Sequence, residues 1–442
     1  MSDATPTATG NRLAGVRERL SGMGPSWVVG AVAAGPATIA SLVTAGAAFD
    51  YALLWVVVLS AAAGTVAQYL AMRLGLLTER GIVAVVEARL GERWAWLLVA
   101  DVVVAAGAAQ VVILNTLAAV TATITGVGAG VCGVAWAVVL AVGLAGRGYG
   151  FLELGAKLLV AGVVVSFVSS LFVVPVDAGR ALDGLVPTLP AGSAVLAAGI
   201  LGGAVHVTLV TMHSYTMRAR GWTASEYDLA TFDVVASMLV AFGVYSVAVF
   251  LVAAGVLTDP NLTTVGAAKA LGPLVGPGAE WLFLLGLGGA AVSTLGGNTV
   301  APPFLLADKL GWGTTVEDGR YRALLAGFAL LSAPGAFIGG EVLGQLVLVL
   351  ALGTVGTPFA LALVLYLLNS PAVPEPTPTL ANVGGVAIFL VSGALAANFV
   401  RGQVAGGLRP LSGAVLAFAV LVAAATLGLV AKYAREEVTT GA

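Results

Sequence analysis

The chain has 442 residues and a formal net charge of -2; 59% of its residues are hydrophobic and only 10% are charged. This balance excludes an ordinary soluble domain, and the lack of a basic excess argues against a nucleic-acid-binding protein. The mean hydropathy of +1.02 indicates an integral membrane protein. The single cysteine, Cys132, excludes a disulfide framework or a cysteine metal cluster.

Apolar stretches long enough to cross a bilayer recur along the chain and predict about twelve transmembrane helices. We expect the first six at 27–47, 50–72, 94–122, 130–146, 153–175 and 195–217. The others are expected at 230–257, 279–306, 321–339, 342–368, 379–400 and 411–433. They predict one polytopic transmembrane domain over residues 24–433, between a cytoplasmic tail of residues 1–23 and a second one of residues 434–442.

The distribution of basic residues predicts the orientation of these helices, because short cytoplasmic loops are enriched in Lys and Arg. If the amino terminus is cytoplasmic, the segments outside hold only Arg180, Lys269, Arg401 and Arg409 of the chain's 20 basic residues. Both termini are therefore expected in the cytoplasm. No signal peptide is expected, because the polar first residues lack a short apolar core with a cleavage site. We expect the plasma membrane of a prokaryote.

Two of the expected helices carry signals for an interruption. The first contains Gly35-Pro36-Ala37-Thr38, where proline removes an amide donor and leaves backbone groups free at bilayer depth. The sixth contains Gly202-Gly203 and both histidines of the chain, His206 and His213. Interrupted helices at matching places in two halves point to a midplane binding site. Alternatively, the two glycines only permit close helix packing.

Several stretches resemble the Nramp metal-ion transporters. Residues 51–55 (Tyr-Ala-Leu-Leu-Trp) and 68–78 (Gln-Tyr-Leu-Ala-Met-Arg-Leu-Gly-Leu-Leu-Thr) are similar to the family's second helix and the loop after it. Weaker similarities follow in the family's order at 24–27, 113–117, 212–214, 285–294, 357–360 and 367–369.

The resemblance spans about residues 24 to 370 and implies an all-α, LeuT-like fold of two inverted repeats with five helices each. Repeat one would cover about 27–175 and repeat two about 195–368, with helices 1 and 6 interrupted. About two extra helices would follow within 379–433. The resemblance also implies proton-coupled uptake of divalent metal by alternating access.

The chain departs from the family at the residues that bind the metal. The family's Asp-Pro-Gly-Asn falls on Gly35, Pro36, Ala37 and Thr38, and its Met-Pro-His falls on His206, Val207 and Thr208. Gly35 and Ala37 can offer only backbone carbonyls, and no carboxylate is evident to balance a divalent charge. The metal ligands, if any, stay unknown.

These departures favour a small polar or anionic solute of the carboxylate or bicarbonate type, bound by exposed amides at an interrupted helix. His206 could add positive charge or exchange a proton, or it could be a packed imidazole bonded to a carbonyl. Asn298 and Thr357, with Thr294, could also line the site or simply bond across helices. The alternatives are uptake of a divalent metal such as manganese or magnesium, and a non-transporting Nramp-like sensor.

The expected coupling residues are Asp101 and His213, with H⁺ or Na⁺ as the coupling ion. The family's acidic pair on helix three falls on Val103 and Ala106, and Asp101 is the nearest carboxylate. An ionisable side chain within a span is costly and points to function, although Asp101 could instead pair with Arg93 or Arg147 near the cytoplasmic surface. His213 could instead orient the second half of its helix. We expect Asp233 to be solvated or paired at the membrane surface.

The sequence does not support an enzyme, because it contains no His-Glu-x-x-His motif and no phosphate-binding loop. No cofactor is expected. The expected partners are the solute or ion and the lipid bilayer, and the oligomeric state stays open.

Overall fold

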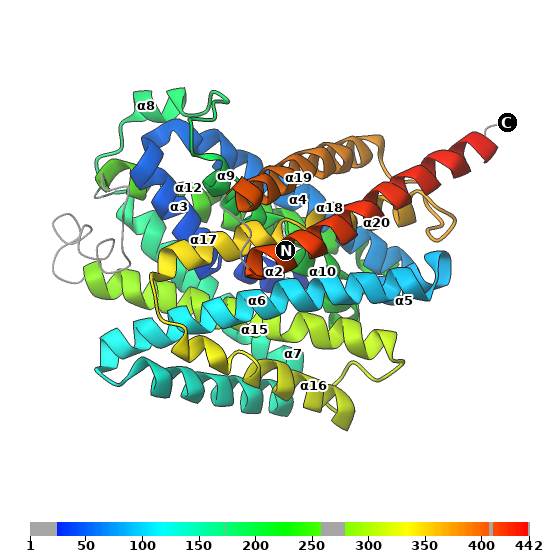
Figure 1. Ribbon diagram of the computed structural model, residues 1–442, viewed down its shortest axis with the longest axis horizontal. Coiled ribbons are helices and arrows are strands. Elements are labelled where there is room, and N and C mark those ends of the chain that lie inside the picture. The colour runs from blue at the N-terminus through cyan, green and yellow to red at the C-terminus, as the bar shows by residue number, and fades with distance from the viewer. Residues whose placement is uncertain (1–23, 173, 258–278, 406–409, 441–442) are drawn as a thin grey trace, which may run out of the picture.

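The computed structural model describes residues 24–172, 174–257, 279–405 and 410–440, and every regular element in these ranges is a helix (Figure 1). The predicted tail of residues 1–23 lies outside them, as do Lys269 and Arg409 of the charge argument.

The elements of the first half are α2 (Pro25–Ala33), α3 (Pro36–Phe49), η1 (Asp50–Leu53), α4 (Leu54–Thr78), α5 (Ile82–Leu90), α6 (Glu92–Thr125), α7 (Ala129–Ser170) and α8 (Ala178–Asp183). Those of the second half begin with α9 (Ala194–Ala204), α10 (Val207–Arg220), η2 (Ala224–Glu226), α11 (Tyr227–Val234), the π-helix η3 (Val235–Phe242) and α12 (Gly243–Val256). The last are α15 (Ala279–Lys309), α16 (Gly319–Leu330), η4 (Ala333–Phe337), α17 (Val342–Gly353), α18 (Thr357–Leu368), α19 (Thr379–Ala405) and α20 (Pro410–Thr440).

The short, interrupted helices form the interior of the bundle. Most of the apolar window of Ala194–Arg220 is buried, whereas little of that in Thr379–Ala405 is. In Figure 1, α19 and α20 lie on the outside, and α20 extends away from the body. The long helices α6 and α15 run side by side. Since membrane helices that meet protein on all sides are the ones that can enclose a polar site, the interior is where a site is expected.

Among the described residues, nine helical stretches are long and apolar enough to cross a membrane. The predicted boundary between spans 130–146 and 153–175 is wrong, because α7 runs from Ala129 to Ser170 without a break. Glycine-rich residues 146–150 do not end the helix, because each glycine costs a helix only about 1 kcal/mol and no proline is present there.

Two later predictions also need correction. The span expected at 321–339 is shorter, because α16 ends at Leu330 and a 3₁₀ turn containing Pro334 follows. The span expected at 342–368 is divided into α17 and α18 by Thr354–Gly356. Pro358, near the start of α18, cannot donate the hydrogen bond that would continue α17. The structure thus has a third interruption.

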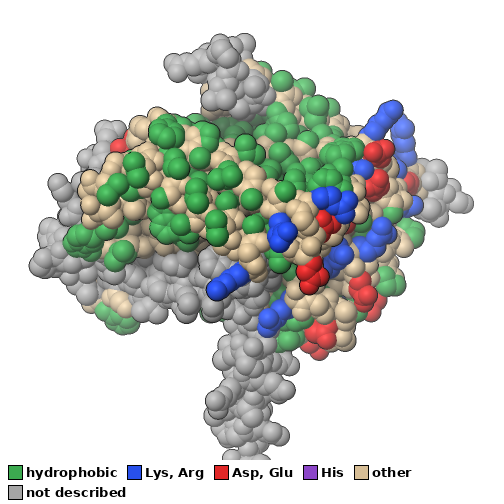
Figure 2. Space-filling model, turned by 90° about the horizontal axis from the view of Figure 1, so that it is seen from below, with side chains coloured by type: hydrophobic (Ala, Val, Ile, Leu, Met, Phe, Trp, Pro, Cys, Tyr) green, Lys and Arg blue, Asp and Glu red, His purple; other side chains and the backbone are tan. Residues whose placement is uncertain are grey.

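In Figure 2, charged side chains gather at one end of the molecule, and hydrophobic side chains cover much of the other described surface in this view. We call this the charged end and define it by the ion pairs Lys309–Glu87, Lys309–Glu92, Arg218–Asp308, Arg320–Asp318 and Arg89–Glu436. An apolar belt with charges at the ends of the helices is the pattern that a bilayer requires.

Candidate functional site

The first two interruptions lie between α2 and α3 and between α9 and α10. At the first, Gly35 adopts an extended conformation, and its carbonyl accepts hydrogen bonds of 3.1 Å from the amides of Thr38 and Ile39. At the second, His206 is extended, and its carbonyl accepts one of 3.1 Å from the amide of Val210. Each interruption therefore ends one helix and starts another inside the protein.

Hydroxyl groups satisfy the carbonyls that the two interruptions release. Thr38 Oγ1 donates to the carbonyl of Ala33 at 2.5 Å, and Tyr245 Oη donates to that of Ala34 at 3.3 Å. Thr294 Oγ1 donates to the carbonyl of Val32 at 3.3 Å. At the second interruption, Thr357 Oγ1 donates to the carbonyl of Val205 at 3.4 Å.

The amides at the start of the following helices are not satisfied in the same way. Those of Ala37 in α3, and of Val207, Thr208 and Leu209 in α10, have no hydrogen-bond acceptor in the part of the chain described. Neither α3 nor α10 has a side-chain cap, and the residues around both starts are buried. Buried, uncapped helix starts carry partial positive charge and need an acceptor from elsewhere.

Both interruptions face one small cavity of about 30 Å³. It is lined by Val32, Gly35, Ala37, Thr38, Ala105, Ala109, Ile113, Gly203, His206, Thr208, Thr294, Asn298, Val349, Leu350 and Gly353. A space of this size can hold a dehydrated ion or about one water molecule in the state captured here.

The structure brings most of the expected binding residues to this cavity. Gly35, Ala37, Thr38, His206, Thr208 and Asn298 line it. Pro36 is the first residue of α3, and Thr357 caps the second interruption; neither is among the lining residues.

Sequence reasoning missed the wall of the cavity that α6 and α17 provide. Ala105, Ala109 and Ile113 recur every four residues and so share one face of α6, and Val349, Leu350 and Gly353 come from the end of α17. The spacing in α6 is a helical signal, but apolar residues with this spacing occur on every face of a membrane helix.

The lining contains no Asp, Glu, Lys or Arg. The amide oxygen Oδ1 of Asn298 is buried without a hydrogen-bond donor in the described structure. His206, 9% exposed, is the only lining residue with an ionisable side chain. Within the described ranges, no three His, Cys, Asp or Glu side chains are grouped so that they could hold a metal ion.

Asp101 lies one helical turn from the cavity wall on α6, next to the third interruption. Its side chain is fully buried, and neither oxygen has a hydrogen-bond partner among the described residues. It packs against Gly356, which precedes α18. The expected alternative of an ion pair with Arg93 or Arg147 is wrong, because the side chain faces the interior between α6 and the start of α18.

His213 belongs to a buried network away from the cavity. Its Nδ1 is 2.8 Å from Oε1 of Gln68 in α4, and its Nε2 is 3.2 Å from Oγ of Ser26 in α2. The amides of Ser26 and Gly24 donate to Asp233 at 2.8 and 3.2 Å. The sequence predicts Asp233 to be either solvated or paired at the membrane surface, and it is not solvated: it is fully buried, and its carboxylate caps the start of α2.

A second network joins α5, α10 and α15 at the charged end. Tyr215 Oη in α10 donates to Oδ2 of Asp308 in α15 at 2.8 Å and accepts from the amide of Val83 at 3.3 Å. The same carboxylate accepts from the amide of Ala84 at 3.2 Å, and the amide of Ile82 donates to Ser214 Oγ at 3.1 Å. The second half of the interrupted helix α9–α10 is thus fastened to α15 and to the start of α5.

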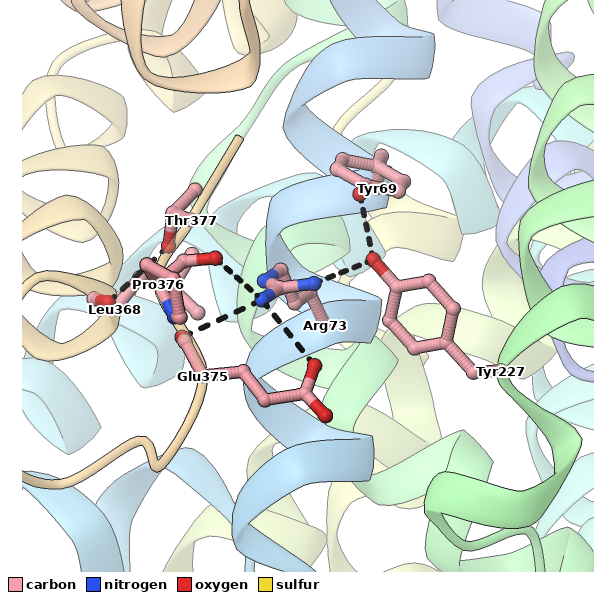
Figure 3. Close-up of polar contacts among 7 residues, drawn as sticks. All are labelled: Tyr69, Arg73, Tyr227, Leu368, Glu375, Pro376 and Thr377. Atoms are coloured by element: carbon pink, nitrogen blue, oxygen red, sulfur yellow. Dashed lines mark hydrogen bonds and ion pairs between the residues drawn. The ribbon is translucent and has the colours of Figure 1, made fainter. Parts of the chain in front are cut away.

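Arg73 in α4 is the centre of a third network, shown in Figure 3. Its Nη1 donates to Tyr227 Oη at 2.6 Å, and that hydroxyl is 2.5 Å from Tyr69 Oη. Its Nη2 donates to the carbonyl of Pro376 at 2.9 Å and lies 3.7 Å from the carboxylate of Glu375. The guanidinium, 4% exposed, therefore joins α4 and α11 to the connection between α18 and α19.

Comparisons with known proteins agree on one family. The sequence profile described as "Natural resistance-associated macrophage protein-like" matches residues 26–401. A protein named divalent metal cation transporter MntH from Acidiphilium cryptum is 28% identical over 380 residues, which cover 80% of this chain and 85% of that protein. One of the same name from Deinococcus radiodurans is 27% identical over 362 residues, 78% of this chain and 81% of that protein.

Solved structures confirm the fold predicted from the sequence. The structure of the Eremococcus coleocola manganese transporter in complex with an aromatic bis-isothiourea compound matches with a TM-score of 0.73 at 15% identity and covers 98% of this chain and 96% of that one. Mhp1, a nucleobase-cation-symport-1 family transporter, matches with a TM-score of 0.57 at 15% identity, over 86% and 93%. The all-α, LeuT-like architecture with interrupted helices is confirmed, and α19 and α20 are the expected extra helices.

The chain is therefore an integral membrane protein and a membrane transporter, as the relatives named above are. By the profile match over most of its length, it belongs to the natural resistance-associated macrophage protein (Nramp) family.

Proposed function

We propose that this protein is a secondary-active transporter whose central cavity takes a small polar or anionic solute of the carboxylate or bicarbonate type. One observation carries the proposal: the uncapped starts of α3 and α10 meet at a cavity that no carboxylate lines. Amides at a helix start bind anions, whereas a divalent cation needs a set of oxygen, nitrogen or sulfur ligands and a compensating charge. Thr208 and His206 would complete the site for an anion.

The transport cycle is alternating access around α2–α3 and α9–α10. Inward opening requires the second half of the interrupted helix, α10, to separate from α15, so the hydrogen bond from Tyr215 to Asp308 has to break. The Ser26–His213–Gln68 network lies within α2, α10 and α4 and would keep these helices together during the movement. This supports a positioning role for His213.

Asp101 is proposed to carry the coupling ion, H⁺ or Na⁺. Its buried carboxylate without a partner is costly unless it binds a proton or a cation during part of the cycle. We further propose that the charged end faces the cytoplasm of a prokaryotic cell with both termini on that side, because the described basic residues of the predicted inside loops gather there.

Uptake of a divalent metal is the second candidate, and the metal-transporting relatives favour it. The imidazole of His206, Oδ1 of Asn298 and backbone carbonyls would then be the ligands, and Asp101, one turn along α6 from the cavity wall, would supply negative charge. This ligand set has no carboxylate in direct contact with the cavity.

The test is uptake into liposomes that contain the purified full-length protein. Manganese, bicarbonate and a panel of small carboxylates are offered, with an internal pH dye and with or without a sodium gradient. We expect saturable uptake of an anion and none of manganese. Thr208→Val should lower uptake, whereas the matched control Thr211→Val should not, because Thr211 lies away from the cavity and bonds only within its own helix.

Saturable manganese uptake that is lost in His206→Ala would overturn the anion proposal and establish the second candidate. For the coupling role, Asp101→Asn should remove accumulation driven by a pH or sodium gradient but retain exchange of solute across the membrane. Accumulation that persists in Asp101→Asn would rule out Asp101 as the coupling residue.

A further inference from the structure

A crevice of about 320 Å³ lies between α18, α19 and α20, apart from the substrate cavity. Its walls are apolar and include Ala362 and Leu365 of α18, Phe389 of α19 and Leu429 of α20. Val386 of α19, 47% exposed, stands at its outer edge. Because α19 and α20 are the most lipid-exposed helices of the bundle, this crevice opens toward the hydrocarbon of the bilayer.

One edge of the crevice is closed by a pair of amides. Nδ2 of Asn369 donates to Oδ1 of Asn382 at 2.9 Å, and Nδ2 of Asn382 donates to Oδ1 of Asn369 at 2.8 Å. Nδ2 of Asn369 also donates to the carbonyl of Leu365 at 2.8 Å. This pair therefore joins the end of α18 to the start of α19 at the crevice.

Basic side chains gather around Tyr366, three residues before Asn369. Tyr366, which lines the crevice, donates to the carboxylate of Glu436 at 2.9 Å, and both Arg89 and Lys432 lie 6.0 Å from the centre of its ring. Arg89 and Lys432 pair with the same carboxylate of Glu436, at 3.7 and 3.9 Å. Two cations that share one carboxylate leave surplus positive charge, and each side chain is more than a third exposed.

We propose that this crevice binds an anionic phospholipid of the surrounding bilayer. One acyl chain lies between α18, α19 and α20, and the phosphate lies beside Arg89 and Lys432 above Tyr366. The order of groups along the crevice, apolar walls followed by basic residues at the charged end, matches the order of groups in a phospholipid. Basic residues at the membrane surface attract anionic lipids.

Native mass spectrometry of the full-length protein, titrated separately with phosphatidylglycerol and phosphatidylcholine, tests the proposal. We expect the wild type to retain phosphatidylglycerol over phosphatidylcholine on the order of ten-fold, since each basic residue near the surface contributes a several-fold preference. Arg89→Gln combined with Lys432→Gln should remove this preference. Val386→Trp, at the exposed edge, should lower retention of both lipids because the indole fills the crevice.

The matched control is Arg320→Gln. Arg320 also lies over an aromatic ring, that of Trp312, and pairs with a carboxylate, that of Asp318, but it is remote from the crevice. It should leave the lipid preference unchanged. Equal retention of both lipids by the wild type, or an equal loss in Arg320→Gln and in the double variant, would overturn the proposal. Elution of each variant as a single peak in size exclusion shows that it is folded, and none of these outcomes depends on the transported solute.

Discussion

The carboxylate of Asp101 in α6 packs so closely on Gly356 that a methyl group at Gly356 would overlap both carboxylate oxygens. Gly356 is the residue that precedes α18, so the carboxylate lies at the start of a helix, where the helix field favours negative charge. The third interruption of the bundle thus holds the acidic side chain for which the described structure provides no hydrogen-bond donor.

Gly356→Ala should lower the free energy of unfolding by about 1–3 kcal/mol, because the added methyl group displaces the Asp101 carboxylate or the start of α18. Combining it with Asp101→Ala should recover much of this loss, because the smaller side chain makes room. Thermal unfolding in detergent, followed by size exclusion, measures both effects. Gly107→Ala is the control, since nothing lies within 4 Å of a methyl group at that position of α6. If the double variant lost as much free energy of unfolding as the two single variants together, the contact between Gly356 and Asp101 would be contradicted.

The interruptions could be predicted from the sequence as far as they depend on local chemistry. Gly35-Pro36 breaks a helix wherever it stands, and the structure ends α2 directly before it. Pro358 gives the same kind of signal in the predicted span 342–368, but the length and apolar character of that span predict a single crossing.

The partners of buried polar residues could not be predicted, because they come from distant parts of the chain. Ser26 is 187 residues from His213, and Asp233 is 207 residues from Ser26. Only packing brings these residues together. The sequence predicts Asp233 to be solvated or paired at the membrane surface, and no local feature of the sequence indicates that its carboxylate is buried at the start of α2.

Tyr215→Phe should loosen the packing of α10 against α5 and α15 at the charged end. The change removes the hydroxyl that donates to Asp308 and accepts from the amide of Val83. Because a hydrogen bond to a charged group contributes about 1.5–3 kcal/mol, the amides of residues 82–85 should exchange with deuterium about ten-fold faster or more. Hydrogen exchange with mass spectrometry measures this rate.

Tyr321→Phe is the matched control for this change. The rings of Tyr215 and Tyr321 both stack on Phe304, at 5.5 and 5.6 Å, but no hydrogen bond of the Tyr321 hydroxyl occurs among the described residues. The rate of deuterium exchange at residues 82–85 in Tyr321→Phe should match that of the wild type. If both variants accelerate exchange equally, ring packing rather than the Tyr215 hydroxyl keeps α10 in contact with α5 and α15.

Arg73→Lys should destabilise the protein by about 1–3 kcal/mol although it keeps the charge. One ammonium cannot replace the planar guanidinium, which reaches Tyr227 and the carbonyls of Glu375 and Pro376 together. Arg320→Lys, at an exposed pair, should change stability by less than about 1 kcal/mol. Thermal unfolding compares the two variants, and equal melting temperatures would show that the Arg73 network contributes only its charge.

Gly35→Ala should reduce transport about ten-fold while the protein still folds. A methyl group at Gly35 would overlap Thr294 Oγ1 and come within 2.9 Å of the carbonyl of Val32, so the interruption between α2 and α3 has to shift. Adding Thr294→Ala removes the overlapping hydroxyl and should restore part of the uptake, which would place the effect at this contact. Gly327→Ala, in open space on α16, should leave uptake unchanged. The measurement is initial uptake into liposomes of the solute that the wild type accumulates. Full uptake by Gly35→Ala would contradict this prediction. The interruption would then accept the methyl group in another backbone conformation, and transport would not require the close contact between Gly35 and Thr294 of α15.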